Sequence, residues 1–454
     1  MSDVHSTEYN FRPKDALLGA QMLFVAFGAL VLVPILTGID SNVALFTAGI
    51  GTLLFQVVTK GKVPVFLASS FAFLPPLFAA QQGEFTYPEI MCGLVAAGVL
   101  YIIISLCIRF FGADFLHKLL PPIVTGPVIM LIGLILAPVA VNMALGHNGQ
   151  VWLEPQIPSM IVAGVALLTT IMFSLLGRGW FKLIPILLGI TAGYTCSLIL
   201  DATGMTASMY DSFVATAVDG KIGGMGIAPW MDKTLISLAP VQNAKLFAIP
   251  NFSMPTWSWE AVLYVVPIAI APAIEHFGDV LAIGSISGKD YVKDPGIQNT
   301  MLGDGLATSL ACMLGGPPNT TYSEVSGAVA LTRAFNPAIM TWAAITAVLL
   351  AFVGKLGGFL NTIPMPVMGG IMLLLFGAIT VIGLNTLVRA QLDLLLPRNM
   401  IIVAIIMVFG LGGMVLNIGI TDLKGIGLGA IAGVVLNLIL PCKDCNEEND
   451  PAEL

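Results

Sequence analysis

Long apolar runs recur along the whole chain and limit its possible folds more than any other feature. An α-helix needs about 20 mostly apolar residues to cross a bilayer. Charged residues make up only 10% of the 454, whereas soluble domains have about 25%. The pattern therefore predicts an all-α polytopic membrane protein. The predicted full spans are residues 16–36, 43–59, 90–107, 124–145, 160–176, 184–200, 261–286, 301–315, 337–352, 366–387, 400–416 and 426–440.

Two further apolar stretches, residues 63–80 and 320–333, are too short and too interrupted to cross a membrane as simple helices. Pro75 and Pro76 break the first, and Gly315 to Pro318 precede the second. Each is the third segment in its half of the chain, as expected for transporters built from inverted repeats. Backbone left unpaired at membrane depth must line a cavity or a ligand. We expect about 14 segments in two repeats of seven, although both stretches could be plain re-entrant loops.

The distribution of basic residues supports this count. If the N-terminus is cytoplasmic and 14 crossings alternate, 14 of the 19 Lys and Arg residues lie inside and five outside. This asymmetry is what the positive-inside rule predicts for the inner (cytoplasmic) membrane of a cell. The predicted organisation is a cytoplasmic tail (1–14), a first repeat (15–200), an extracellular linker (201–260), a second repeat (261–440) and a second cytoplasmic tail (441–454).

Few ionisable residues lie within the apolar runs, and they cluster in three consecutive segments. They are Glu275, His276, Asp279, Asp304 and Glu324. Charged groups at membrane depth are a functional-site hypothesis by default. Glu275 and Asp279 are four residues apart and share a helix face, where two carboxylates tend to hold one proton between them. Structural roles remain open for Asp279 and Asp304, and His276 is expected to pack or hydrogen-bond.

The second broken stretch begins with groups suited to a planar heterocycle. Tyr322 offers an aromatic face, Ser323 a hydroxyl and Glu324 a carboxylate, and Phe71 and Phe73 add rings from the first stretch. A pyrimidine needs stacking surface, acceptors for its ring N–H groups and donors for its carbonyl oxygens. Simple core packing remains an alternative for both phenylalanines.

Motifs for other kinds of chemistry are absent from the sequence. The chain has no HExxH, no P-loop and no GxSxG motif, so the sequence predicts neither an enzyme nor a metal or organic cofactor. It also lacks a basic stripe for nucleic acid. The expected partners are a small nucleobase, protons and the lipid bilayer.

Six short segments are more specific than composition. They resemble the nucleobase–ascorbate transporters (the nucleobase:cation symporter-2 family) and, within them, the bacterial uracil permeases. The segments read FGALVLVP (27–34), GTLL (51–54), GKVPVFLASSFA (61–72), NTTY (319–322), EVSGAVALTR (324–333) and IPMPVMGG (363–370).

The resemblance implies a core domain and a gate domain, with short strands in the third and tenth segments. It implies that Glu275 and Glu324 bind the base. Phe71, with Ala72 beside it, would pack on the base, and the backbone at Tyr322 and Ser323 would meet it. We expect proton-coupled uptake of uracil by alternating access, in a protein that is often a homodimer. From the buried acids, Glu275, Asp279 and Asp304 are the expected proton-coupling residues.

Three positions depart from the pattern of uracil permeases. Val325 replaces an asparagine of the family signature, Met22 a common histidine, and Asp279 a histidine of many uracil permeases. Xanthine or another oxopurine therefore stays open as the substrate. An anion exchanger or channel of related architecture is a second class, although its site should favour positive groups over buried acids.

Overall fold

The computed structural model describes residues 6–112, 120–218, 221–229, 231–417, 419 and 422–441. Lys118 and Lys443 of the charge count, and nearly all of the predicted C-terminal tail, lie outside the described residues. Five side chains inside helices also lie outside the description, at Phe27, Ala29, Trp180, Ser323 and Glu324.

The first half of the chain contains the first broken segment, between longer helices. Its elements are η1 (Pro13–Asp15), α1 (Ala16–Thr37), α2 (Ser41–Val58), β1 (Leu67–Ser69), η2 (Phe71–Phe73), α3 (Leu74–Gln81), α4 (Tyr87–Phe111), α6 (Pro122–Leu145), β2 (Val151–Trp152), α7 (Gln156–Leu176), η3 (Gly179–Lys182) and α8 (Pro185–Ala202).

The second half follows a connection that carries α9 (Met205–Val214), β3 (Lys221–Ile222), β4 (Met225–Ile227) and α10 (Ala239–Asn243). Its elements are α11 (Trp259–Val265), α12 (Ile270–Ser287), η4 (Val292–Gly296), α13 (Ile297–Met313), β5 (Asn319–Thr321), α14 (Ser323–Thr332), α15 (Ala338–Ala351), α16 (Gly354–Leu360), α17 (Met365–Arg389), α18 (Pro397–Leu411), β6 (Val415–Asn417), β7 (Asp422–Lys424) and α19 (Gly425–Ile439).

Helix length divides the spans into classes that the sequence did not separate. Among the described residues, six helices are long and apolar enough to cross a membrane singly, and two more candidate spans are bent helix pairs. One of these pairs is α11 with α12, which meet at 45°. Four further apolar helices are shorter than a full span. The twelve full spans predicted from the sequence are thus partly short or bent, because apolar composition does not report where a helix breaks.

Local sequence explains where several of these helices begin and end. α1 ends at Gly38 and α12 at Gly288, both with left-handed backbone near φ +70°, which glycine adopts without a steric penalty. α4 begins with a capping box, in which the Thr86 backbone N–H donates to Glu89 at 2.8 Å. Such caps satisfy N–H groups that have no partner within the helix.

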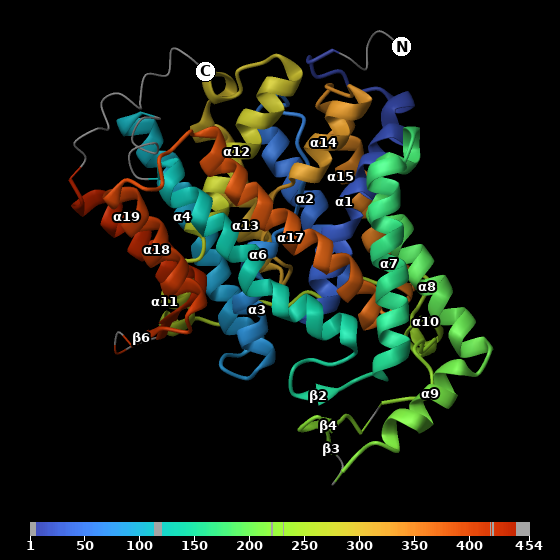
Figure 1. The fold of residues 1–454 in the computed structure, drawn as a ribbon. Coiled ribbons are helices and arrows are strands. Elements are labelled where there is room, and N and C mark those ends of the chain that lie inside the picture. Colours follow the sequence, from blue (N-terminus) through green and yellow to red (C-terminus); the bar gives the residue numbers. More distant parts are fainter. Residues whose placement is uncertain are drawn as a thin grey trace.

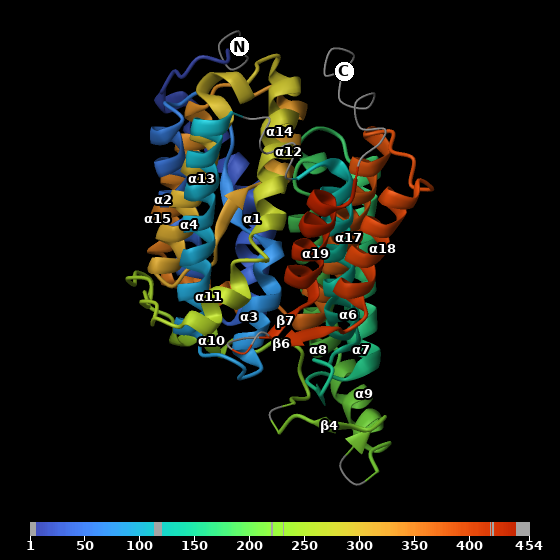
Figure 2. The ribbon, with the colours of Figure 1, turned by 90° about the vertical axis from the view of Figure 1, so that its left-hand side faces the viewer.

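The helices form two bodies that lie side by side (Figure 2). In one, α2 packs on α15 and α13, and α4 packs on α13 and α11. In the other, α6 and α17 form the most extensive helix pair, joined by α7, α8, α18 and α19. We call these the core body (α1–α4 and α11–α15) and the gate body (α6–α8 and α17–α19). This arrangement confirms the predicted core and gate architecture.

Glycines allow the closest helix approaches in both bodies. A Cβ added at Gly133 of α6 would come within 2.3 Å of the Phe376 carbonyl oxygen of α17. In the core body, a Cβ at Gly98 of α4 would lie 2.7 Å from the Gly305 carbonyl oxygen of α13. Small residues are the usual means by which membrane helices bring their backbones together.

The connection between the halves is folded; its first part attaches to the gate body, and residues 248–256 hydrogen-bond to the core body. β2, β4 and β3 form a small sheet around the buried Trp152, at the end of the molecule opposite the N-terminus (Figures 1 and 2). The Asp201 carboxylate at the end of α8 accepts hydrogen bonds from the backbone N–H groups of Leu235 and Ile236 at 3.0 Å. The described part of the connection is therefore folded onto the rest of the molecule.

Candidate functional site

Strands β1 and β5 join the two broken segments inside the core body. They pair antiparallel, with Leu67 opposite Thr321 and Ser69 opposite Asn319, and all six strand residues are buried. The Thr52 hydroxyl of α2 accepts a hydrogen bond from the Leu67 backbone N–H at 2.9 Å. Buried backbone groups need such partners, and here the two broken segments supply most of them to each other.

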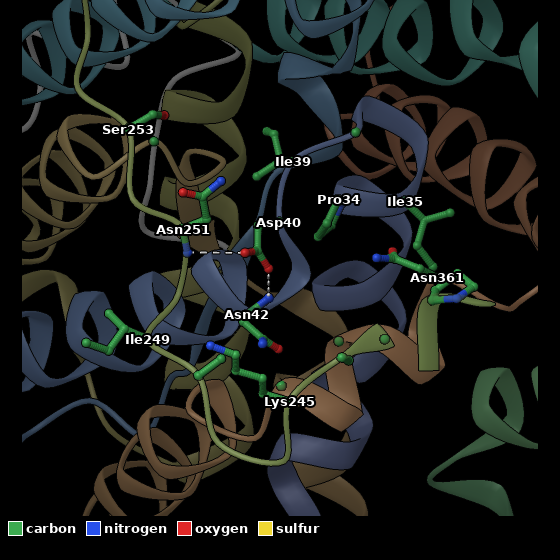
Figure 3. Close-up of a pocket in the computed structure, with 18 of the residues that line it drawn as sticks. Pro34, Ile35, Ile39, Asp40, Asn42, Lys245, Ile249, Asn251, Ser253 and Asn361 are labelled. Carbon is green, nitrogen blue, oxygen red and sulfur yellow. Dashed lines mark hydrogen bonds between the residues drawn. The ribbon is translucent and has the colours of Figure 1, made fainter. Parts of the chain in front are cut away.

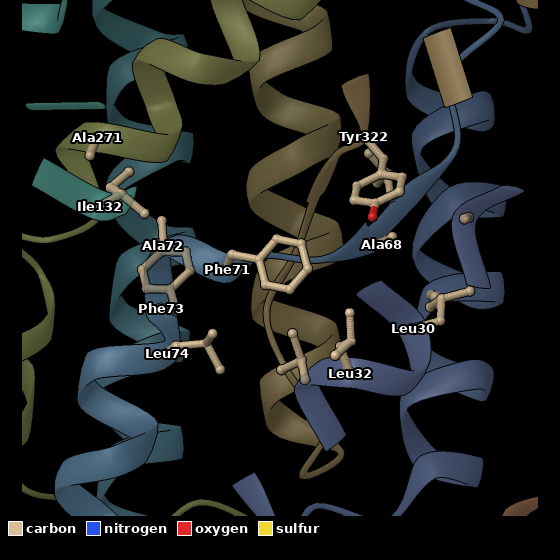
Figure 4. Close-up of a cluster of buried hydrophobic side chains, with 14 of the residues drawn as sticks. Leu30, Leu32, Ala68, Phe71, Ala72, Phe73, Leu74, Ile132, Ala271 and Tyr322 are labelled. Atoms are coloured by element: carbon tan, nitrogen blue, oxygen red, sulfur yellow. The ribbon is translucent and has the colours of Figure 1, made fainter. Parts of the chain in front are cut away.

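Aromatic residues follow both strands and extend into the same region. Phe71 and Ala72 lie in η2, directly after β1, and Tyr322 directly follows β5. All three are buried, and Figure 4 shows the Phe71 and Tyr322 rings projecting toward a common space. Phe71 also meets Phe376 of the gate body edge-on, with ring centroids 6.1 Å apart. The predicted aromatic surface therefore lies where the core and gate bodies meet.

The two acids on α12 have different surroundings. Glu275 is half-buried, whereas the Asp279 side chain is almost fully buried. Asp279 accepts a hydrogen bond from the Thr321 hydroxyl of β5 at 2.9 Å. Asp279 is thus tied to the strand that precedes Tyr322, a contact that the sequence did not reveal.

Asp304 lies deeper, on α13, with no solvent exposure. Its Oδ1 is 3.7 Å from Nδ1 of His276, which is equally buried. The other ring nitrogen of His276 hydrogen-bonds the Thr300 hydroxyl at 3.0 Å. His276 therefore hydrogen-bonds within the core body, as the sequence led us to expect.

Ser323 and Glu324 form the first turn of α14, immediately after Tyr322. Their backbone position brings them to the end of β5, next to the aromatic residues. The two side chains belong to the undescribed part of the chain, so the predicted role of Glu324 rests on its position alone.

An open cavity lies elsewhere, between the core body and the folded connection (Figure 3). It has a volume of about 730 Å³, and none of the predicted site residues lines it. Asp40 closes one side by accepting hydrogen bonds from the backbone N–H groups of Asn42 at 2.8 Å and Asn251 at 3.2 Å. Asn361, which follows α16, lines the other side. Sequence reasoning missed this cavity because its walls come from segments hundreds of residues apart.

Metal chemistry has no obvious basis in this arrangement. Within the described ranges, no group of three or more His, Cys, Asp and Glu side chains is arranged to hold a metal ion. The site instead offers aromatic faces, backbone groups at strand ends and carboxylates, which suit a small planar polar molecule.

Two helical bodies, paired strands in broken segments and buried acids on the adjoining helices define a membrane transporter of two seven-segment repeats. The particular family follows from comparison with known proteins. The model of a group described as the permease family matches residues 13–419, and this chain belongs to that family. It is a permease and not an enzyme.

Relatives match over nearly their full lengths. A probable uracil permease of Pasteurella multocida (strain Pm70) is 48% identical, over 97% of this chain and 96% of that protein. The uracil permease of Bacillus caldolyticus is 40% identical, over 95% and 93%. That of Escherichia coli (strain K12) is 36% identical, over 93% and 90%.

Solved structures support the same architecture. The transmembrane domain of a cyanobacterium bicarbonate transporter, BicA, matches with a TM-score of 0.58, over 95% of this chain and 99% of that chain. Murine solute carrier 26 family member A9, an anion transporter, matches with a TM-score of 0.61, over 94% and 68%. Both are only 12% identical, so the likeness concerns the fold alone.

Proposed function

We propose that this permease takes up uracil together with protons across the cytoplasmic membrane. The main support is the meeting of β1 and β5, which brings Phe71 and Tyr322 together beside the acids of α12. Relatives named uracil permeases, at 34–48% identity, supply the substrate hypothesis. Xanthine and other oxopurines share the same edge chemistry and serve as competitors in the test.

The base would bind at the ends of the two strands. In this proposal Phe71 packs on the ring, and Ala72, having a small side chain, lets the base approach the backbone. The backbone at Tyr322 and Ser323 contacts the carbonyl oxygens. Glu275 and Glu324 accept hydrogen bonds from ring N–H groups, since an ionised carboxylate offers only acceptors.

Coupling to protons would use the buried acids of α12 and α13. Glu275 binds or releases a proton when the base binds. Asp279 and Asp304 take part in proton coupling by gaining or losing charge with it. An ionised carboxylate far from water is costly, so proton binding and release would shift the preferred arrangement of the core body against the gate body. This is alternating access, with both termini cytoplasmic and two chains associating through their gate bodies.

Anion transport is the rival class, because both similar solved structures are transporters of anions. The acids of α12 oppose it: Glu275 and Asp279 lie next to the paired strands, where an ionised carboxylate would repel an anion. Uptake of chloride or bicarbonate itself, in the absence of any nucleobase, would favour this class.

The decisive experiment is uptake of radiolabelled uracil into proteoliposomes with an inward proton gradient, competed by unlabelled xanthine. We expect gradient-driven accumulation that xanthine does not suppress. Glu275→Gln should abolish accumulation while the protein still inserts, because the amide cannot exchange a proton. Strong competition by xanthine would move the substrate to the oxopurines, and full accumulation by Glu275→Gln would contradict the role of Glu275.

A further inference from the structure

His276 and Asp304 form an enclosed polar pair between α12 and α13. Both side chains have 0% solvent exposure, and Nδ1 of His276 faces Oδ1 of Asp304 at 3.7 Å. Within the described residues, neither oxygen of Asp304 has a hydrogen-bond partner, and Nδ1 of His276 has none either. Buried polar atoms in this state require a physical explanation.

The opposite side of the imidazole restricts how this pair is protonated. Nε2 of His276 lies 3.0 Å from the Thr300 hydroxyl, which itself donates to the Ile297 carbonyl oxygen at 3.1 Å. A hydroxyl has only one proton to donate. While that bond is made, Nε2 must carry a hydrogen and donate to Thr300. In a neutral ring Nδ1 is then a bare acceptor, facing the acceptor oxygen of Asp304.

Two bare acceptors facing each other in a dry site are unfavourable, because each loses its hydrogen bonds to water without replacement. One proton in the gap removes this conflict wherever it resides. The proton can sit on the Asp304 carboxyl group, or on Nδ1 as part of an imidazolium beside a carboxylate. If Thr300 instead rotates to donate to Nε2, the neutral ring carries its own hydrogen on Nδ1 beside an ionised Asp304, and the pair then binds no additional proton.

Among the described residues, the surroundings of Asp304 contain further acids but no Lys or Arg that pairs with it. Glu275, Asp279 and Tyr101 of α4 are near enough to interact electrostatically with Asp304. The backbone N–H of Thr321 also lies near Asp304, although outside hydrogen-bonding geometry. Within the described chain, no Lys or Arg forms an ion pair with Asp304. His276 is therefore its available proton partner.

We propose that His276 and Asp304 bind one proton between them, as a proton site separate from Glu275. Thr321 would link this site to the substrate region, since its hydroxyl donates to Asp279 while its backbone N–H lies beside Asp304. Loss of the shared proton would leave a carboxylate that attracts the Thr321 N–H and pulls on β5. The proton site stands on the geometry, whereas its part in coupling rests on the proposed function.

Nitrogen NMR of the full chain in lipid bilayers tests the proton directly. The sequence has only four histidines, so ¹⁵N-histidine labelling gives few signals, and His276→Gln identifies the relevant pair. We expect a hydrogen on Nε2 of His276 together with a proton bound to Nδ1 or hydrogen-bonded to it from Asp304. A neutral ring whose only hydrogen is on Nδ1 would overturn the proposal. His147 is an internal reference, because its Nδ1 accepts from the Gly149 N–H at 3.1 Å.

Two substitutions of Asp304 show whether a proton lies between His276 and Asp304 and which of the two groups carries it. Asp304→Asn keeps a donor toward Nδ1 but removes the exchangeable carboxyl proton, whereas Asp304→Leu removes both and should shift Nδ1 to the position of a bare acceptor. A bare Nδ1 in the unmodified protein would overturn the proposal. If Asp304→Leu does not fold, infrared spectroscopy of Asp304→Asn replaces it. Loss of a protonated-carboxyl band then places the proton on Asp304, and an unchanged infrared spectrum with a bare Nδ1 rejects the site.

Transport measurements then test the role in coupling. In proteoliposomes, Asp304→Asn should lower the number of protons moved per uracil while exchange of internal for external uracil continues. An equal loss of both would mean that Asp304 has only a structural role in transport. A chain that carries the shared proton but transports no uracil would contradict the proposed function and leave the proton site standing.

Discussion

Thr321 is the residue through which strand β5 contacts the buried acids. It is 4% exposed, its hydroxyl donates to Asp279, and its backbone pairs with Leu67 of β1. A single side chain thus positions α12 relative to the paired strands. Because Tyr322 is the next residue, any displacement here would reach the proposed base-binding backbone.

Replacing Thr321 by valine should therefore weaken uracil binding without unfolding the protein. The change keeps the shape but leaves the Asp279 oxygen without this donor, which costs about 1–3 kcal/mol. We expect the apparent affinity for uracil to fall roughly 10-fold or more. Thr321→Ser, which keeps the hydroxyl, is the matched control. Equal affinities for the two variants, measured by uracil binding in detergent, would contradict this role.

Glu154 lies in the loop between β2 and α7, outside the spanning helices. Its ionisation makes the stability of the folded protein depend on pH. Its Oε2 is buried and has no hydrogen-bond partner among the described residues, and burial raises the pKa of Glu154 to about 8. The backbone N–H of Met365 opposes this shift, and the nearby Asp201 carboxylate adds to it. The folded protein therefore holds a proton that the unfolded chain releases at a lower pH.

The raised pKa of Glu154 makes the folded protein less stable as the pH rises. Below the ordinary pKa of 4.5, Glu154 is protonated in both states and does not lower the free energy of unfolding. Between about pH 4.5 and about pH 8 the unfolded chain ionises first, so the free energy of unfolding falls as the pH rises. Glu154→Gln should therefore raise Tm in detergent by a few degrees above about pH 8 and leave it unchanged near about pH 4. A stabilisation that does not vary with pH would contradict this origin.

At the scale of elements, the extensive packing of α6 on α17 depends on glycines that have no side chain. Gly133 of α6 lies against the Phe376 carbonyl and the Thr380 hydroxyl of α17. Gly133→Ala should destabilise the protein by about 1–3 kcal/mol through overpacking, seen as a lower Tm in detergent. Gly164 of α7 has open space around its missing Cβ, so Gly164→Ala is the control and should not lower Tm. A loss of equal size in both would contradict overpacking at Gly133 as the cause, because helix propensity alone favours alanine over glycine.

The sequence predicts elements well where one physical rule dominates. Apolar runs located the spans because lipid demands them. The proline and glycine breaks located the two interrupted segments, whereas the strands β1 and β5 were expected only from the family resemblance. The hydrogen bonds Thr52–Leu67, Thr321–Asp279 and Thr300–His276 join segments whose spacing carries no signal. The cavity beside Asp40 and the bends in long spans escaped prediction for the same reason: they arise from tertiary packing.

At the scale of the molecule, the question is how the core and gate bodies move. Contacts between them are few compared with contacts within each, and α1 meets α8 at one of them. A Cβ added at Gly28 of α1 would lie 3.7 Å from the Ile186 Cβ of α8. Disulfides form when the two Cβ atoms are about 3.5–4.5 Å apart. The pair is therefore placed to receive a covalent link between the two bodies.

The double variant Gly28→Cys and Ile186→Cys should lose uracil uptake on oxidation and recover it on reduction, because the link prevents the two bodies from moving apart. Each single variant should be insensitive to oxidant. A link inside the gate body is the stronger control: a Cβ at Gly189 would lie 3.3 Å from that of Thr170, slightly closer than the usual disulfide separation, so a small shift lets the corresponding double cysteine join two helices of one body. If both bodies move as rigid units, this second link leaves uptake intact. Uptake that survives a complete link between Gly28 and Ile186 would mean that transport does not require these bodies to separate here, and alternating access would have to proceed by a smaller, local rearrangement around the paired strands.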